Sequence, residues 1–247
     1  MEEEKRTVRA VERALDILIC FTSKSEWGLS EIASEVGLHK STVFRLMATL
    51  EDRGFVIRDE ATEKYRLGLR ILELSSNLSR EGDPSVVLLP GMERLRDEIG
   101  ETVSLYVRDG NERVRIQAVQ SAQAIRRVAP VGARMPLSVG ASSKVLLAFA
   151  EEPVRKEAMA DPAWPASVDR AAYVRQLDEI RAAGYATSFE EREPGAAAVS
   201  APIFNRAGKL AAALAVSGPS NRLTPDVMHR HAPAIMEAAQ RMGKLLG

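Results

Sequence analysis

Residues 29–54 read Leu-Ser-Glu-Ile-Ala-Ser-Glu-Val-Gly-Leu-His-Lys-Ser-Thr-Val-Phe-Arg-Leu-Met-Ala-Thr-Leu-Glu-Asp-Arg-Gly, and this stretch predicts two short helices joined by a tight turn. Ser30 is a favourable N-cap for the first helix, and Gly37 provides the permissive backbone that the turn requires. In the second helix, apolar residues recur at i, i+3, i+4 and i+7, so that one face packs inward. These inward residues are Val43, Leu46, Met47 and Leu50.

The remaining surface of the second helix carries side chains that can reach DNA. They are Lys40, Ser41, Thr42, Phe44, Arg45 and Thr49. Such side chains contact phosphates, base edges or a thymine methyl group when a recognition helix lies in the major groove. We interpret the stretch as a helix-turn-helix. A pair of helices that packs only on its own core is the alternative, because helix pairs are common and share this pattern.

Two short strand-like runs, 55–58 and 64–67, follow the second helix and flank a polar turn. A hairpin directly after a recognition helix is typical of a wing, which favours the helix-turn-helix over a simple helix pair. Arg58, Lys64 and Arg66 are the candidate phosphate contacts of this wing. The turn between the runs, 59–63, is acidic, so we expect the tip itself to stay off the phosphates.

Size and composition indicate an ordinary two-domain protein. The chain has 247 residues, of which 45% are hydrophobic and 28% charged. Its apolar runs are shorter than the roughly 18–20 residues that a membrane span needs. The N-terminus is charged with no apolar stretch behind it, and one cysteine excludes an intramolecular disulfide. These features predict a cytoplasmic protein.

The charge balance weighs against a nonspecific DNA-coating protein. The whole chain has 34 basic and 34 acidic residues, and residues 1–67 contain 11 Lys and Arg against 13 Asp and Glu, a net charge of −2. DNA binding therefore requires positive charge to be concentrated locally, with a moderate salt dependence. The local charges available are Lys5, Arg6, Arg9, Lys40 and Arg45.

The sequence predicts a DNA-binding domain over 1–67, a linker helix over 68–84 and a second domain over 85–247. A helical pattern over 67–79 ends at Gly82-Asp-Pro84. Its apolar stripe suits pairing with a second subunit, and folding back on its own domain is the alternative.

The second domain mixes helical and strand patterns, which predicts an α+β fold with a mainly antiparallel sheet and helices at its sides. Helices are expected over 86–100, 141–150, 151–159 and 169–183, and after the cap at Thr224. Strands are expected over 102–109, 113–119, 125–128, 185–190, 196–203 and 209–217.

Taken together, the chain resembles an IclR-type transcriptional regulator over essentially its whole length. Residues 38–46 resemble the recognition helix of that family's winged helix-turn-helix. In the second domain, the positions that match the family's C-terminal signature are Gly184, Ser188, Glu191, 198–200 and 203–205, flanked by 132–144 and 216–222. The resemblance implies a GAF-like effector-binding domain, homo-oligomers built from dimers (a homodimer or a homotetramer), and control of DNA binding by a small organic molecule.

The resemblance also implies which residues line the effector cavity. They are Ser138, Val139, Gly140, Ala141, Ser142, Ser188, Ala198, Ala215 and Ser217. Small residues from Gly140 to Ser143 enter a helix and offer backbone N–H groups to a carboxylate. Tight packing at a helix start explains the same residues equally well.

Several cavity positions depart from the family pattern. Ser188 replaces a common Asp, Ala198 a common Cys, Ala215 a common Ser and Ser138 a common His. The pocket should therefore be less polar than in relatives that hold very small acids. We expect a larger or more apolar organic acid, with aromatic acids as the leading class. Glyoxylate- or pyruvate-sized acids are the competing class.

Two other functions compete with the regulator. An enzyme could use Glu190, Glu191 and Glu193 as acid–base groups, or His229 and His231 as metal ligands. Adjacent acids before a Pro-Gly pair more often form a solvated loop, and histidines at i and i+2 on a helix face apart. No nucleophile motif or nucleotide-binding loop occurs, so we expect no catalysis, metal or cofactor. The second competitor is an oligomeric ligand sensor without DNA readout.

Overall fold

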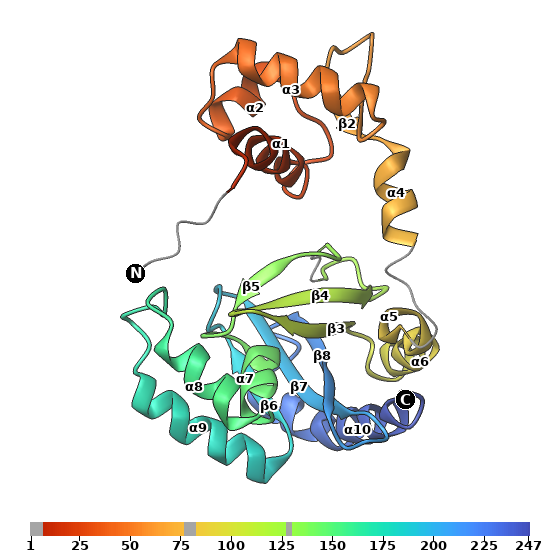
Figure 1. The fold of residues 1–247 in the computed structure, drawn as a ribbon. Coiled ribbons are helices and arrows are strands. Elements are labelled where there is room, and N and C mark those ends of the chain that lie inside the picture. The colour runs from red at the N-terminus through yellow and green to blue at the C-terminus, as the bar shows by residue number, and fades with distance from the viewer. Residues whose placement is uncertain (1–6, 77–82, 127–129) are drawn as a thin grey trace. The chain divides into compact units, whose positions relative to one another are not determined.

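The computed structural model describes residues 7–76, 83–126 and 130–247. The chain divides into two compact units, Met1–Arg80 and Glu81–Gly247, and each is described by itself (Figure 1). In the first unit, the predicted connecting helix is α4 (Leu69–Ser76), and the rest of that prediction, 77–79, lies outside the described residues. A linker helix between two domains stays a prediction.

Three helices form the core of the N-terminal unit: α1 (Arg9–Cys20), α2 (Leu29–Glu35) and α3 (Lys40–Asp52). Ile17, Ile32 and Met47 are fully buried where these helices meet. Gly37 has φ +64°, as the predicted turn requires. The expected cap at Ser30 is wrong, because α2 begins one residue earlier and Glu31 Oε2 accepts the N–H of Gly28 at 2.7 Å.

The predicted wing is a two-stranded antiparallel sheet of β1 (Val56–Arg58) and β2 (Tyr65–Leu67). Its turn is held by Asp59 Oδ1, which accepts the N–H groups of Ala61 and Thr62, both at 2.9 Å. Tyr65 also forms an isolated bridge with Trp27, which ties the wing to the loop before α2.

The C-terminal unit contains a six-stranded antiparallel sheet in the order β5-β4-β3-β8-β7-β6. The strands are β3 (Thr102–Asp109), β4 (Glu112–Val119), β5 (Arg134–Pro136), β6 (Ala186–Phe189), β7 (Ala196–Phe204) and β8 (Leu210–Pro219). The α+β prediction is thus confirmed. The strand expected over 125–128 is wrong where it can be described, because Ile125 lies in a bend, and 127–128 lie outside the described residues.

The two faces of this sheet carry different helices (Figure 1). Alternate side chains of a strand point to opposite faces. Leu214 and Val216 of β8 accordingly join one core cluster with α6 (Leu89–Ile99) and α10 (Pro225–Gly243). Ala213 and Ala215 join the other with α7 (Ala141–Ala148), α8 (Glu152–Ala160) and α9 (Arg170–Ala183).

Helix boundaries follow local chemistry. Thr224 caps α10 as predicted, accepting the N–H of Val227 at 3.4 Å. The single helix expected over 86–100 is instead α5 (Pro84–Val87) followed by α6. Pro90 explains the break, because it lacks an N–H and cannot continue the hydrogen-bond ladder from the preceding turn.

Gly243 lets α10 pack closely against β7. A Cβ atom built there would lie 2.1 Å from the carbonyl oxygen of Phe204. We expect Gly243→Ala to lower the free energy of unfolding by about 1–3 kcal/mol because of this collision. The loss is expected even though alanine is more favourable than glycine inside a helix by about 1 kcal/mol. Thermal unfolding followed by circular dichroism measures this. Gly247→Ala is the control, because no atom lies within 4 Å there, and a more stable Gly243→Ala would contradict the packing.

Candidate functional site

The predicted DNA-contacting side chains of α3 reach solvent. Phe44 is 53% exposed, unusually high for an aromatic residue, and Lys40 and Arg45 are also exposed. Ser41 and Thr49 are exposed and Thr42 is half-buried. None of the salt bridges between described residues involves Lys40 or Arg45, so these cations are available to a polyanion.

The three wing cations are not equivalent. Arg58 forms a salt bridge with Glu63 at 3.0 Å, so part of its charge is already neutralised within the turn. Lys64, just before β2, and Arg66, in the middle of β2, are exposed and form no salt bridge among the described residues. The acidic turn therefore competes with phosphate for Arg58 but leaves the other two cations available.

A small cavity on the α7 face of the sheet gathers most of the predicted effector-binding residues. It encloses about 50 Å³. Seven predicted residues line it: Gly140, Ala141, Ser142, Ser188, Ala198, Ala215 and Ser217. Three larger side chains that the sequence did not predict also line it: Tyr106, Arg113 and Arg192.

Arg113 dominates the electrostatics of this cavity. It is only 4% exposed. Its Nη1 donates to Ser142 Oγ at 3.0 Å and its Nη2 contacts Met135 Sδ at 3.6 Å, while its buried Nε has no partner. No carboxylate oxygen of the described residues lies within 4 Å of it. Arg113 is thus a buried cation without a counter-ion.

The charge of Arg113 persists despite its burial. Burial lowers the pKa of its guanidinium to about 10, and the neighbouring charge of Arg192 acts in the same direction. The group is therefore still protonated at neutral pH. A buried charge is costly unless it is paired and hydrogen-bonded, so an anion that entered this cavity would relieve that cost.

Tyr106 holds two arginines of β4 in place. The guanidinium carbons of Arg113 and Arg115 lie 5.3 and 5.2 Å from the centroid of its ring. Its hydroxyl oxygen accepts from Arg115 Nε at 3.0 Å. Cation–π contacts of this kind stabilise a partly desolvated guanidinium without neutralising it.

Gly140 allows the start of α7 to approach Arg113. Its φ is +95°, and a Cβ atom there would lie 2.8 Å from Arg113 Nη1. The expectation that the Gly140 N–H is free for a ligand is wrong, because Glu191 Oε2 accepts it at 3.2 Å. Glu191 also forms a salt bridge with buried Lys144, whose Nζ donates to the carbonyl of Thr187 at 3.2 Å. Glu191 is therefore engaged with Lys144 rather than with Arg113.

The four serines predicted to line the effector cavity do not all lie together. Ser142, Ser188 and Ser217 line the cavity, and the buried Ser217 Oγ has no hydrogen-bond partner. Ser138 and Val139 do not line it, and Ser138 lines a separate cavity instead. The chain changes direction at Gly140, which has a positive φ, so residues just before and after it face different cavities.

The three acids that suggested an enzyme and one of the two histidines, His229, have structural partners. Glu190 Oε1 accepts from the N–H of Gly195 at 3.1 Å and from Ser220 Oγ at 2.6 Å. His229 Nδ1 lies 2.8 Å from the Tyr185 hydroxyl. Within the described residues, no three His, Cys, Asp or Glu side chains gather as a metal site would require.

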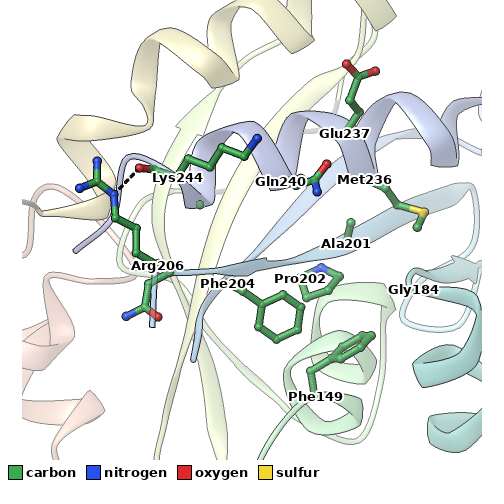
Figure 2. Close-up of a pocket in the computed structure, with 12 residues that line it drawn as sticks. Phe149, Gly184, Ala201, Pro202, Phe204, Arg206, Met236, Glu237, Gln240 and Lys244 are labelled. Carbon is green, nitrogen blue, oxygen red and sulfur yellow. Dashed lines mark hydrogen bonds between the residues drawn. The ribbon is translucent and has the colours of Figure 1, made fainter. Parts of the chain in front are cut away.

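A roomier cavity of about 550 Å³ lies at the edge of the sheet, between β7 and α10 (Figure 2). Phe149 and Phe204 pack edge-to-face in it, with ring centroids 5.5 Å apart. Arg206 Nε donates to the carbonyl of Lys244 at 2.8 Å. No predicted site residue lines this cavity, and neither does any unpartnered buried side-chain atom of the described residues. Volume alone does not make it the ligand site.

No helix among the described residues is both long and apolar enough to cross a membrane.

Comparison with known proteins identifies both units. Residues 10–60 match the IclR helix-turn-helix domain, and residues 85–244 match the C-terminal domain of the bacterial transcriptional regulator IclR. The transcriptional regulator KipR of Bacillus subtilis is 30% identical over 97% of this chain and 97% of its own. The regulator BhcR of Paracoccus denitrificans is 33% identical over 97% of this chain and 88% of its own.

Solved structures agree with the sequence matches. An IclR regulator from Alicyclobacillus acidocaldarius has a TM-score of 0.81 and 26% identity, covering 98% of this chain and 100% of its own. An IclR homologue from Microbacterium hydrocarbonoxydans in complex with 4-hydroxybenzoate has a TM-score of 0.83 and 26% identity, covering 96% of this chain and 98% of its own. This chain therefore belongs to the IclR family of DNA-binding transcriptional regulators.

Proposed function

We propose that an organic acid bound at Arg113 controls how this regulator binds its operator. The observation that carries the proposal is the buried guanidinium of Arg113 without a carboxylate partner. Ser142 orients it, Ser217 Oγ offers a second unpartnered polar atom, and both residues line the same cavity. A ligand carboxylate satisfies both groups, since arginine binds carboxylates through two parallel hydrogen bonds.

The size of the acid depends on Arg192. A water molecule needs about 10–15 Å³ of such space, so the cavity of about 50 Å³ accommodates a short acid as it stands. Arg192 lies in the loop between β6 and β7, and its side chain is 31% exposed. Outward rotation of this side chain would admit an aromatic acid. The 4-hydroxybenzoate complex of the Microbacterium homologue supports the aromatic class.

On the DNA side, we assign α3 to the major groove. Lys40, Ser41 and Thr42 stand at its N-terminus, where recognition helices contact bases and phosphates. Arg45 and Phe44 follow within one turn, suited to a guanine edge and a thymine methyl group. Lys64 and Arg66 of the wing supply phosphate contacts.

A homodimer through the N-terminal unit fits the exposed apolar side chains of α1. Val8, Val11, Leu15 and Ile19 recur along one side of this helix and are 53–65% exposed. A second copy that covered them would place two recognition helices on half-sites about 34–36 Å apart, or a multiple of that. Association of such dimers into tetramers remains the further expectation of the family.

The acid acts by shifting a conformational equilibrium. The two conformations differ in how the two recognition helices are placed. The acid can shift the equilibrium between them only by as much as its affinity for the two differs. A regulator of this kind represses or activates according to which arrangement fits the operator.

Replacing Arg113 tests the acid site. We expect Arg113→Met to weaken binding of the responsive acid by tenfold to about a hundredfold, through loss of a charge-assisted hydrogen bond. The acid-free protein should be equally stable or more stable by about 1 kcal/mol, since a buried unpaired charge is removed. Thermal unfolding with and without acids measures both effects. Arg175→Met, on an exposed position of α9, is the control; equal acid stabilisation in both variants would exclude Arg113 from the site.

Replacing α3 residues tests DNA readout. Arg45→Ala should weaken the free energy of operator binding by about 1–3 kcal/mol and relax specificity at one base position. Lys40→Ala should instead weaken binding to DNA of every sequence and reduce the salt dependence of binding. Fluorescence anisotropy on DNA selected from a random pool measures both. Lys156→Ala, an exposed residue of α8, is the control. Failure of the wild type to select any sequence would support the ligand sensor without DNA readout.

Charging the apolar side of α1 tests the dimer. Leu15→Lys combined with Val11→Lys should lower affinity for DNA with two half-sites on the order of tenfold or more, because linked binding of the second helix is lost. Affinity for a single half-site should not change. Leu245→Lys is the control, since that residue is 53% exposed in the other unit. Unchanged two-site affinity would place the dimer contact elsewhere.

A further inference from the structure

A second cavity in the C-terminal unit contains two buried polar atoms that lack partners. Ser138 Oγ and Trp164 Nε1 are both inaccessible and without a hydrogen bond, and both residues line a cavity of about 270 Å³. The remaining lining residues come from the β3–β4 turn, the start of β4, the end of β5 and the segment after it, α8 and the loop after α8. None of its lining residues is shared with the cavity at Arg113.

Two such atoms in one cavity indicate a missing partner. The large majority of buried side-chain polar atoms in proteins are hydrogen-bonded to protein or to ordered water. The Trp164 Nε1–H can only donate, so its partner must present an acceptor atom. The Ser138 hydroxyl can donate or accept, so it fits the same partner or an adjacent group.

The tryptophan donor is held rigidly. The Trp164 ring packs edge-to-face on Tyr173, with centroids 5.1 Å apart. The Tyr173 hydroxyl donates to the carbonyl of Leu137 at 2.7 Å, which fixes the residue next to Ser138. The ring orientation is therefore fixed, but Nε1 has no accessible surface in this structure, so a ligand that accepted from it would have to displace the neighbouring side chains slightly.

The charged groups of the walls favour a cationic or neutral ligand, although Arg170 donates to the backbone carbonyl of Asp161 at 3.0 Å and lies near its carboxylate. Glu112 and Asp161 line the cavity, and Glu112 is already paired with Arg134 at 2.6 Å. Asp161 Oδ1 accepts the N–H of Ala163 at 2.8 Å, but its carboxylate forms no salt bridge with any cation of the described residues. An ammonium group is its natural counter-ion, whereas an organic anion would be repelled.

We propose that this cavity is a second ligand site, which binds a small primary amine carrying a carbonyl group, of the amino-acid amide class. The carbonyl oxygen accepts from Trp164 Nε1, and the ammonium group pairs with Asp161. The Ser138 hydroxyl completes the site beside the carbonyl. The site is independent of the acid pocket, and it stands whether or not an acid at Arg113 controls DNA binding.

Fluorine NMR of the full-length protein labelled with 5-fluorotryptophan tests the proposal. The chain has two tryptophans, so the spectrum should hold two resonances, which Trp164→Phe assigns. Trp27, the other one, lies in the N-terminal unit with its Nε1 bonded to the carbonyl of Cys20 at 3.1 Å. Glycinamide is the probe, acetamide lacks the ammonium group, and acetate carries the opposite charge.

We expect glycinamide to shift the Trp164 resonance saturably in the millimolar range and to leave Trp27 unmoved. Acetamide should bind about tenfold more weakly and acetate not at all. Ser138→Ala and Asp161→Asn should each weaken glycinamide binding by about five- to tenfold. Asp161→Asn should keep the local fold, since the asparagine side-chain oxygen can still accept the N–H of Ala163. Ser138→Ala removes only a hydroxyl group that has no partner. No saturable shift, or the same affinity in both variants as in the wild type, would overturn the proposal and leave ordered water as the partner of the two atoms.

Discussion

The C-terminal unit holds the guanidinium of Arg113 in its interior without a carboxylate partner among the described residues. Arg113 stands on β4, an internal strand, so its guanidinium is enclosed by β5, α7 and the Tyr106 ring rather than by water. Gly140 is required at that point because a side chain there would collide with the guanidinium. Glu191, in the loop between β6 and β7, pairs with Lys144 rather than with Arg113. A buried charge without a partner lowers the stability of the fold, and such costs are common at functional sites, which is why we propose this guanidinium as the acid site.

In the N-terminal unit, by contrast, function requires exposed side chains, because those that contact DNA must lie at the surface. Ile17, Ile32 and Met47 supply a compact core, which leaves the outer surface of α3 free for DNA and one side of α1 apolar and uncovered. Exposed aromatic and aliphatic side chains are costly on an isolated surface but useful where a base or a second subunit covers them. With a net charge of −2 over residues 1–67, nonspecific attraction to DNA is weak, so under the proposed dimer we expect affinity to depend mainly on paired half-sites.

Features governed by short-range rules could be predicted from the sequence. The apolar spacing of α3 and the cap at Thr224 depend on neighbours within a few residues, and both are found. β5 was missed because it is three residues long and ends at a proline. Arg113 was missed because charged residues that alternate along a strand usually face solvent, and its burial comes from segments distant in sequence. Ser138 was misplaced because the turn at Gly140 separates it from its chain neighbours.

The most direct test measures DNA binding and its response to organic acids in the same experiment. Fluorescence anisotropy would follow full-length wild-type protein and Arg113→Met on DNA from upstream of the protein's own gene and on an unrelated duplex, with a panel of aromatic and short aliphatic acids at two salt concentrations. The account predicts preferential binding to the upstream DNA, changed by one class of acid in the wild type and by none in the variant. An acid that altered DNA binding equally in both proteins would contradict it, because control would then not pass through Arg113.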